Sequence, residues 1–280
     1  MTINEQALWL HGEGFDMLGI VSLPPASTPT QRTGVVIVVG GAQYRAGSHR
    51  QFVQLARFLA EGGFPVLRFD LPGMGDSPGE LPSFEDTAPH IATAINGFQR
   101  QHPGVERVVL WGLCDGASAS LLYVDATHDP RIAGLALLNP WVRSEVSLAR
   151  ARVKHYYRQR LREPDFWRKL LKGLVGWQAL RELARNLHGM RQSTREMTSF
   201  QDRMAQGWQA FPGPILLLLS ENDLTAQEFA EHAGRSSPWS SWSSKHQLTR
   251  LVLFGADHTC SSPEAVMAVE AQTRDWLRQS

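Results

Sequence analysis

Short apolar runs of strand character alternate along this chain with segments of helical spacing. The strand-like runs are Gly34–Val39, Pro65–Phe69, Arg107–Trp111, Ile132–Leu138, Ile215–Leu219 and Leu251–Phe254, and the helical segments are 48–61, 83–101, 115–126 and 263–277. Helices between successive strands form right-handed crossovers that lay the strands parallel. The pattern therefore predicts an α/β domain with a mostly parallel central sheet and helices on both faces.

Two local patterns add detail to this outline. Residues 6–23 alternate loosely around a glycine-containing turn and predict an N-terminal hairpin. Residues 48–51 (SHRQ) fit a capping box, in which the Ser48 side chain caps the helix that follows. In sheets of this kind, reactive groups belong in the loops at the carboxyl ends of the strands.

The composition is that of a globular protein. Hydrophobic residues make up 42% of the 280 residues and nine residues are Trp, so the chain can bury a sizeable core and disorder is excluded. A net charge of +1 argues against a general nucleic-acid binder. The start, MTINEQALWL, lacks the basic region and the following apolar stretch of a signal peptide. The apolar runs are far shorter than the ~20 residues of a membrane helix. Two Cys residues do not make a disulfide framework. We expect a soluble, cytoplasmic protein.

Positive charge is concentrated in the middle of the chain. Residues 143–208 contain 15 of the 28 Lys and Arg residues but only 6 of the 27 Asp and Glu residues. This helical, Trp-bearing stretch falls between two predicted strands, so it predicts a helical cap at residues 142–210, inserted into a core of residues 1–141 and 211–280. Its positive charge and aromatic side chains suit the binding of a ligand with an anionic group on an apolar chain, such as a phosphopantetheine thioester or an acidic glycolipid. A solvated outer surface of a lid explains them equally well.

The strongest motif is WGLCDGA at residues 111–117, directly after a predicted strand and before a predicted helix. It has the G-x-C-x-G spacing of a nucleophile elbow, a tight turn in which the central residue is strained and its neighbours must be small. Cys114 is then the nucleophile, because the positive end of the helix favours its thiolate, and the Asp115 backbone N–H faces a developing oxyanion. A buried Cys in an ordinary tight turn is the alternative.

Two further residues complete a catalytic set. Asp223 follows the predicted strand Ile215–Leu219, and His258 follows the last predicted strand, so the chain order is nucleophile, acid, histidine. We expect His258 to be the base for Cys114 and Asp223 to orient it. Asp257 is the rival acid, but its adjacency to His258 gives it poor geometry.

The loop at residues 40–47 (GGAQYRAG) follows the first parallel strand and predicts the second half of the oxyanion hole. The Ala42 N–H is the candidate donor, with Gln43 as the alternative. The expected substrate contacts are Gln43, Tyr44, Arg45 and Trp141. The glycines do not fit a dinucleotide site or a P-loop, because G-x-G-x-x-G and G-K-[ST] are both absent, and we expect no cofactor and no metal.

The runs VVIVVGG, LRFDLPGMGDS, GLCDG, SEND and GADHT together resemble the α/β-hydrolase superfamily over essentially the whole chain. This resemblance implies an α/β-hydrolase fold with an inserted helical cap. More narrowly, GGAQYRAGSHRQF, GLCDGASA and KHYYRQRL with FWRKLL resemble the exosortase A system-associated hydrolase 1 family, whose bacterial members occur beside exopolysaccharide and protein-sorting genes. Cys114 departs from the serine of the common pattern, but similar cysteine elbows occur in dienelactone hydrolases and polyester synthases.

These residues predict covalent acyl transfer on a small-molecule acyl substrate that is carrier-linked, CoA-linked or anionic. Cys114 attacks an activated carbonyl, and His258 protonates the leaving group and then activates water. We expect hydrolysis of an ester, thioester or lactone. Because a thioester intermediate keeps much of its acyl-transfer potential, transfer to an alcohol or amine is the alternative. A non-catalytic binding protein is a third hypothesis, although neither a broken triad nor lost elbow glycines are seen.

Overall fold

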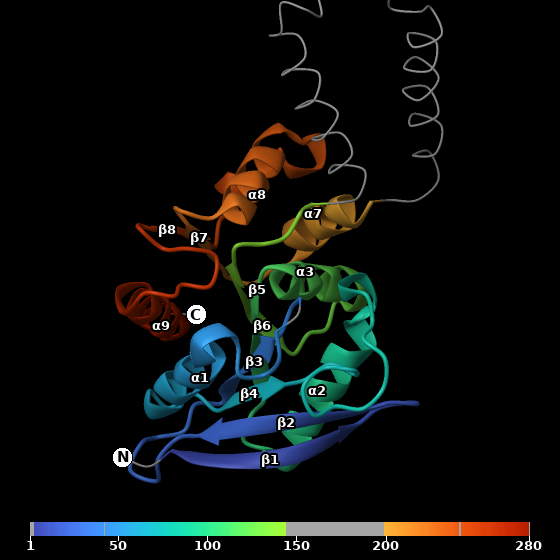
Figure 1. The fold of residues 1–280 in the computed structure, drawn as a ribbon, viewed down its shortest axis with the longest axis vertical. Helices are drawn as coiled ribbons and strands as arrows, with labels where there is room; N and C mark the ends of the chain where they lie inside the picture. Colours follow the sequence, from blue (N-terminus) through green and yellow to red (C-terminus); the bar gives the residue numbers. More distant parts are fainter. Residues whose placement is uncertain (1–2, 42, 144–198, 241, 280) are drawn as a thin grey trace, which may run out of the picture. The chain divides into compact units, whose positions relative to one another are not determined.

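The computed structural model describes residues 3–41, 43–143, 199–240 and 242–279, and this part of the chain contains one eight-stranded sheet (Figure 1). The strands are β1 (Asn4–His11), β2 (Asp16–Leu23), β3 (Thr33–Val38), β4 (Val66–Phe69), β5 (Arg107–Leu113), β6 (Ile132–Leu138), β7 (Ile215–Ser220) and β8 (Leu248–Leu253). Their order across the sheet is β1-β2-β4-β3-β5-β6-β7-β8. The β1–β2 hairpin and the β2–β4 pair are antiparallel, and all other neighbours are parallel. The predicted hairpin and mostly parallel sheet are confirmed.

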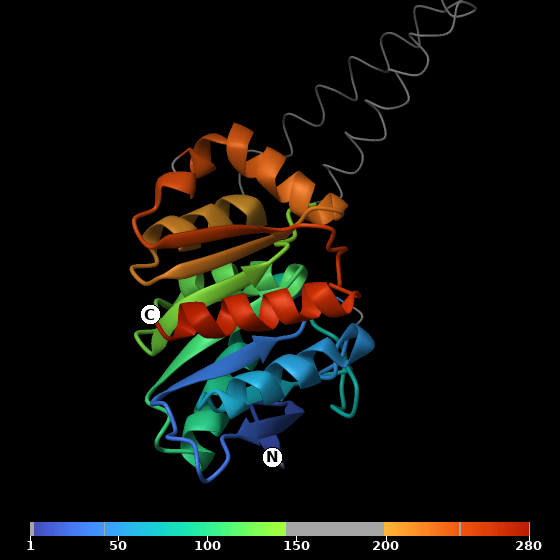
Figure 2. The same cartoon turned by 90° about the vertical axis from the view of Figure 1, so that its left-hand side faces the viewer.

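Helices cover both faces of the sheet, as predicted. They are α1 (Gln51–Glu61), α2 (Ala88–Gln101), α3 (Asp115–Thr127), α7 (Phe200–Ala210), α8 (Leu224–Arg235) and α9 (Pro263–Leu277). Figure 2 shows α1 and α9 side by side on one face. Figure 1 places α2 and α3 on the other face, where α7 packs along α3. None of the helices in the described ranges is long and apolar enough to cross a membrane.

The centre of the sheet is the hydrophobic core, because helices cover it from both sides. Every residue of β7 is buried, and so is every residue of β3 after Thr33, as expected for apolar strands inside a parallel sheet. α1 buries one stripe of its surface, which includes Phe52, Leu55, Ala56 and Leu59, whereas α3 is buried at every residue from Gly116 to Val124. The parallel strands β5, β7 and β8 end at the same edge, so the residues that follow them are brought together.

The start of α1 differs from the predicted capping box. His49 and Arg50 adopt left-handed dihedral angles, with φ of 53° and 61°, and α1 begins only at Gln51 without a side-chain cap. Ser48 Oγ instead accepts a hydrogen bond from Gln43 Nε2 at 3.0 Å. The left-handed pair turns Ser48 away from the first helical N–H groups, so the capping-box prediction is wrong.

The chain divides into two compact units, one of residues 1–142 and 200–280 and the other of residues 143–199. The predicted cap falls largely outside the described residues, at 144–198, and stays a prediction. Its expected last part, α7, belongs to the unit that contains the sheet. The reason is an apolar stripe on α7, where Phe200, Met204 and Trp208 are buried at successive turns of the helix. The sheet-bearing unit therefore resumes at Phe200 rather than at residue 211.

Candidate active site

Cys114 lies in a tight turn between β5 and α3. Its φ of 60° and ψ of −125° are strained for a residue with a side chain. The flanking glycines are required sterically, because a Cβ on Gly112 would overlap the Gly116 backbone and a Cβ on Gly116 would overlap the Val38 carbonyl oxygen. The geometry is that of the elbow predicted from the G-x-C-x-G spacing. It holds the Cys114 side chain, which is partly exposed, at the N-terminus of α3.

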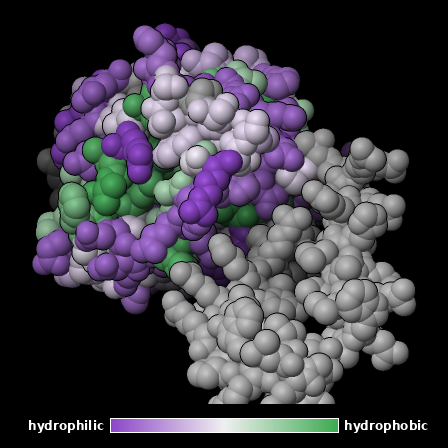
Figure 3. Space-filling model, turned by 90° about the horizontal axis from the view of Figure 1, so that it is seen from above, coloured by the Kyte–Doolittle hydropathy of each residue, from purple (hydrophilic) through white to green (hydrophobic). Residues whose placement is uncertain are grey.

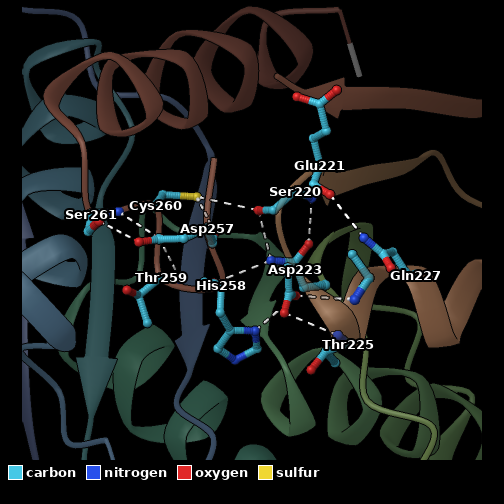
Figure 4. A network of polar contacts seen from close by, with 12 residues as sticks. Ser220, Glu221, Asp223, Thr225, Gln227, Asp257, His258, Thr259, Cys260 and Ser261 are labelled. Atoms are coloured by element: carbon cyan, nitrogen blue, oxygen red, sulfur yellow. Dashed lines mark hydrogen bonds and ion pairs between the residues drawn. The ribbon is translucent and has the colours of Figure 1, made fainter. Parts of the chain in front are cut away.

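Asp223 is the N-cap of α8 and lies directly after β7. Its Oδ1 accepts a hydrogen bond from Thr225 N at 3.1 Å, and its Oδ2 accepts one from Ala226 N at 3.2 Å. The same Oδ2 lies 2.9 Å from His258 Nδ1, and Figure 4 shows the imidazole facing the carboxylate. Burial alone would raise the pKa of Asp223, but the hydrogen bonds from His258 and from the helix N–H groups outweigh burial and lower the pKa below its ordinary value.

His258 is hydrogen-bonded to Asp223 and lies close enough to Cys114 for the thiol to affect its charge. Its hydrogen bond with Asp223 and then its hydrogen bond with the Cys114 side chain raise the pKa of His258 to about 10, although burial opposes the rise. The charged imidazolium is therefore favoured at neutral pH. The structure thus brings together the three side chains that the sequence singled out, and it places them at the carboxyl ends of β5, β7 and β8.

Asp257, the rival acid, turns away from the imidazole. Its carboxylate accepts hydrogen bonds from Thr259 N at 3.2 Å and Ser261 N at 2.9 Å, and a further one from the Ser261 hydroxyl (Figure 4). These bonds lower the pKa of Asp257, beginning with the Ser261 hydroxyl. Asp257 therefore shapes the loop that carries His258 and does not orient the ring.

The Asp115 side chain was not anticipated as part of the site. Its Oδ2 accepts a hydrogen bond from Gly41 N at 2.7 Å and so ties the loop after β3 to the elbow. Burial raises the pKa of Asp115, although backbone N–H groups, first that of Gly41, and the charge of His258 oppose the rise. An acidic residue immediately after the nucleophile was the available signal, but its partner lies 74 positions away in the chain.

The expected oxyanion donors are backbone N–H groups of the loop after β3 and of the first turn of α3. The Gly41 N–H is bonded to Asp115, and the Gln43 N–H donates to Gly40 O at 3.3 Å. Ala42, the candidate donor, lies outside the described residues. The Asp115 N–H belongs to the first turn of α3, directly after Cys114.

The four expected substrate contacts separate into three groups. Gln43 and Tyr44 line a hollow of about 430 Å³, together with Gly41, Gly73, Met74, Gly75, Asp76 and Leu81. Arg45 is not brought to this hollow, since its guanidinium is paired with the buried Asp70 and with Asp76. Trp141 lies beside the elbow, where its backbone N–H donates a hydrogen bond to the backbone oxygen of Cys114 at 3.2 Å. Among the described residues, no group of three or more His, Cys, Asp or Glu side chains is arranged to hold a metal ion.

Comparison with known proteins agrees with this architecture. A sequence profile of the alpha/beta hydrolase family matches residues 35–269. The human protein ABHD12B is 36% identical over 78 residues, which make up 28% of this chain and 20% of that protein, so the match spans a fifth of that relative.

Two solved structures share the fold. The Pyrococcus furiosus esterase Pf2001 superposes with a TM-score of 0.64 and 14% identity, over 99% of this chain and 93% of that chain. XC6422 from Xanthomonas campestris, an α/β serine hydrolase without a lid, superposes with a TM-score of 0.61 and 14% identity, over 100% of this chain and 96% of that chain. On the evidence of its sheet, its elbow and the profile match over most of its length, the chain belongs to the alpha/beta hydrolase family.

Proposed function

We propose that this protein is a hydrolase that cleaves an ester, thioester or lactone through a covalent acyl-cysteine on Cys114. The observation that carries the proposal is the hydrogen bond between His258 and Asp223 close to Cys114, with the cysteine in a strained elbow at a helix N-terminus. Such a constellation activates a nucleophile, because the histidine accepts its proton and the acid fixes the histidine.

The chemical steps follow from the charges of the three groups. The Cys114 sulfur attacks the substrate carbonyl as a thiolate, and the carbonyl oxygen becomes an oxyanion. His258, charged through its bonds to Asp223 and Cys114, gives its Nε2 proton to the leaving group when the carbon–leaving-group bond breaks. The neutral imidazole then takes a proton from water, which attacks the thioester and releases the acid and the thiolate.

We assign the oxyanion hole to the backbone N–H groups of Ala42 and Asp115. Support comes from the neighbouring loop groups, since the N–H groups of Gly41 and Gln43 already have partners within the protein. The Asp115 N–H adds the partial positive charge of the α3 N-terminus.

The substrate assignment rests on the hollow that is lined by the loop after β3. Gln43 offers an amide and the half-exposed Tyr44 offers an aromatic ring, which suits a group with both apolar and hydrogen-bonding parts. Apolar side chains are also exposed in a patch bordered by polar ones on the face seen in Figure 3. Leu224, directly after Asp223, is 61% exposed. We extend the proposal to an acyl chain attached to an anionic group, in keeping with the 15 Lys and Arg residues at positions 143–208.

The resemblance to exosortase-associated hydrolases adds a biological setting to the proposal. It suggests a bacterial, cytoplasmic enzyme that serves exopolysaccharide or protein-sorting systems. Free thiols such as Cys114 and Cys260 suit a reducing compartment. Transfer of the acyl group to an alcohol or amine is a second candidate function, because the acyl-cysteine can be attacked by either in place of water.

The test is intact-protein mass spectrometry after incubation with p-nitrophenyl esters and acyl-CoA thioesters of several chain lengths. Wild type and Cys260→Ala should each gain one acyl group, and Cys114→Ala should gain none. Cys260 is a fair control because it is a free thiol in the same region that is 2% exposed. An adduct that persists in Cys114→Ala, or hydrolysis that does not need Cys114, would overturn the proposal. Addition of alcohols or amines to the reaction separates hydrolysis from acyl transfer by the product formed.

A further inference from the structure

Asn139 is a buried polar residue next to the His258 backbone, and no motif in the sequence points to it. It follows β6 directly, its side chain is 0% exposed, and its φ of 49° lies in the left-handed region. A buried amide must find partners for its acceptor oxygen and its donor nitrogen, because an unpaired polar group in the core costs stability.

The Asn139 carboxamide finds those partners on two different loops. Its Oδ1 accepts a hydrogen bond from Ser220 N at 2.8 Å. Its Nδ2 donates to Ser220 Oγ at 2.9 Å and to the backbone oxygen of His258 at 3.3 Å. One side chain therefore joins the end of β7, which leads to Asp223, to the loop that carries His258.

The same short segment is bonded to the nucleophile. Cys114 N donates to Leu138 O at 2.9 Å, and Trp141 N donates to Cys114 O at 3.2 Å. Residues 138–141 are thus fixed to the elbow through their backbone and to the His258 loop through the side chain of Asn139. This is a direct hydrogen-bonded path between the backbones of Cys114 and His258.

Apart from the Asn139 bond, the hydrogen bonds that join the backbone of the His258 loop to other described segments lead to the loop after β7 and not to the segment 138–141; Asn222 N, for example, donates to Ala256 O at 2.9 Å. Ser220 Oγ lies 3.8 Å from Cys260 Sγ, and Figure 4 shows Ser220 between Cys260 and the Asp223 loop. Thiol contacts of this kind are weak. The hydrogen bond of His258 Nδ1 to Asp223 orients the ring, but it does not fix the backbone from which the ring projects.

We propose that Asn139 is a positioning residue that sets the His258 imidazole relative to the Cys114 sulfur by bonding the segment 138–141 to the His258 loop. The inference rests on the proposed function, in which Cys114 is the nucleophile and His258 its base. The role requires an amide. A carboxylate could not donate to the His258 oxygen, and an apolar side chain would leave both Ser220 N and His258 O without this partner.

The test compares Asn139→Gly with Ala92→Gly. Glycine adopts the left-handed backbone at position 139 without strain, so the first variant removes the amide and keeps the turn. The second variant weakens α2, away from the site, and serves as the control for lost stability. Two quantities are measured, the rate of Cys114 alkylation by iodoacetamide from pH 5 to pH 10, and kcat and KM with a p-nitrophenyl ester.

We expect Asn139→Gly to lower kcat at least about tenfold with KM changed less than about twofold, because it displaces a catalytic group and leaves the substrate hollow intact. Alkylation should be slower than in wild type, since the sulfur loses its aligned imidazolium. Ala92→Gly should change neither quantity. Asn139→Ser, whose hydroxyl can accept from Ser220 N but is too short to reach His258 O, should show the same losses if the glycine variant does not fold.

An alkylation profile and a kcat equal to wild type in folded Asn139→Gly would refute the positioning role and leave a structural role only. Failure of the proposed function has a different signature, in which wild type itself forms no acyl adduct and hydrolyses none of the esters. The alkylation profile needs no substrate, so the two failures are distinguishable.

Discussion

The strained backbone at Cys114 predicts that glycine at this position gives a more stable protein than alanine does. With φ of 60° and ψ of −125°, a residue that carries a Cβ is strained by about 1–3 kcal/mol. Glycine avoids this strain but has more conformational freedom in the unfolded chain, which costs about 0.5–1 kcal/mol. The middle of each range, about 2 minus about 0.75 kcal/mol, predicts that Cys114→Gly is about 1.25 kcal/mol more stable than Cys114→Ala. At 2–4 °C per kcal/mol, this raises Tm by roughly 2.5–5 °C.

The comparison of these two variants isolates the backbone, because both lack the thiol. Urea denaturation followed by circular dichroism gives the free energy of unfolding, and an unchanged dependence on urea shows that the unfolded state is the same. Ala126→Gly, at an exposed position of α3 with ordinary helical geometry, is the control of opposite sign and should lose about 0.5–1 kcal/mol. If Cys114→Gly were no more stable than Cys114→Ala, the elbow would not be strained and this reasoning would fail.

Three further outcomes follow from the site. Asp223→Asn should lower kcat for ester hydrolysis by about 10³–10⁴-fold, because an amide at this position holds the imidazole in the wrong tautomer; activity within tenfold of wild type would assign the acid elsewhere. The raised pKa of His258, from 6.5 to about 10, contributes stability that is fully present below pH 6.5 and lost as pH rises to 10, so the urea midpoint should fall over this range. The fall should be smaller in Asp223→Asn, which removes the largest cause of the raised pKa of His258 and leaves the contribution of Cys114. Gly116→Ala should destabilise the protein by about 1–3 kcal/mol in the same assay, since its methyl group would overlap the Val38 carbonyl oxygen, and wild-type stability would contradict the steric argument.

Prediction from the sequence was accurate where a local pattern determines a local structure. The strand at Ile132–Leu138 has the predicted bounds, and the closing helix from Pro263 to Leu277 does also. The start of α1 was wrong because Ser48 has a competing partner in Gln43, and the left-handed pair after it separates it from the helix. The helix α8 was not predicted, although Asp223 caps it, because this carboxylate was assigned only to the histidine.

The sequence by itself determined the elbow and the edge of the sheet at which the site lies. Only glycine fits two residues before and two residues after Cys114, and alternating strands and helices bring the carboxyl ends of parallel strands to one edge. Only the tertiary structure decided the partners within the site. Arg45 is paired with Asp70, Asp115 holds Gly41, and Asn139 reaches a residue 119 positions away. These contacts join loops distant in sequence, and no local spacing encodes them, because their distances are set only when the whole sheet has assembled.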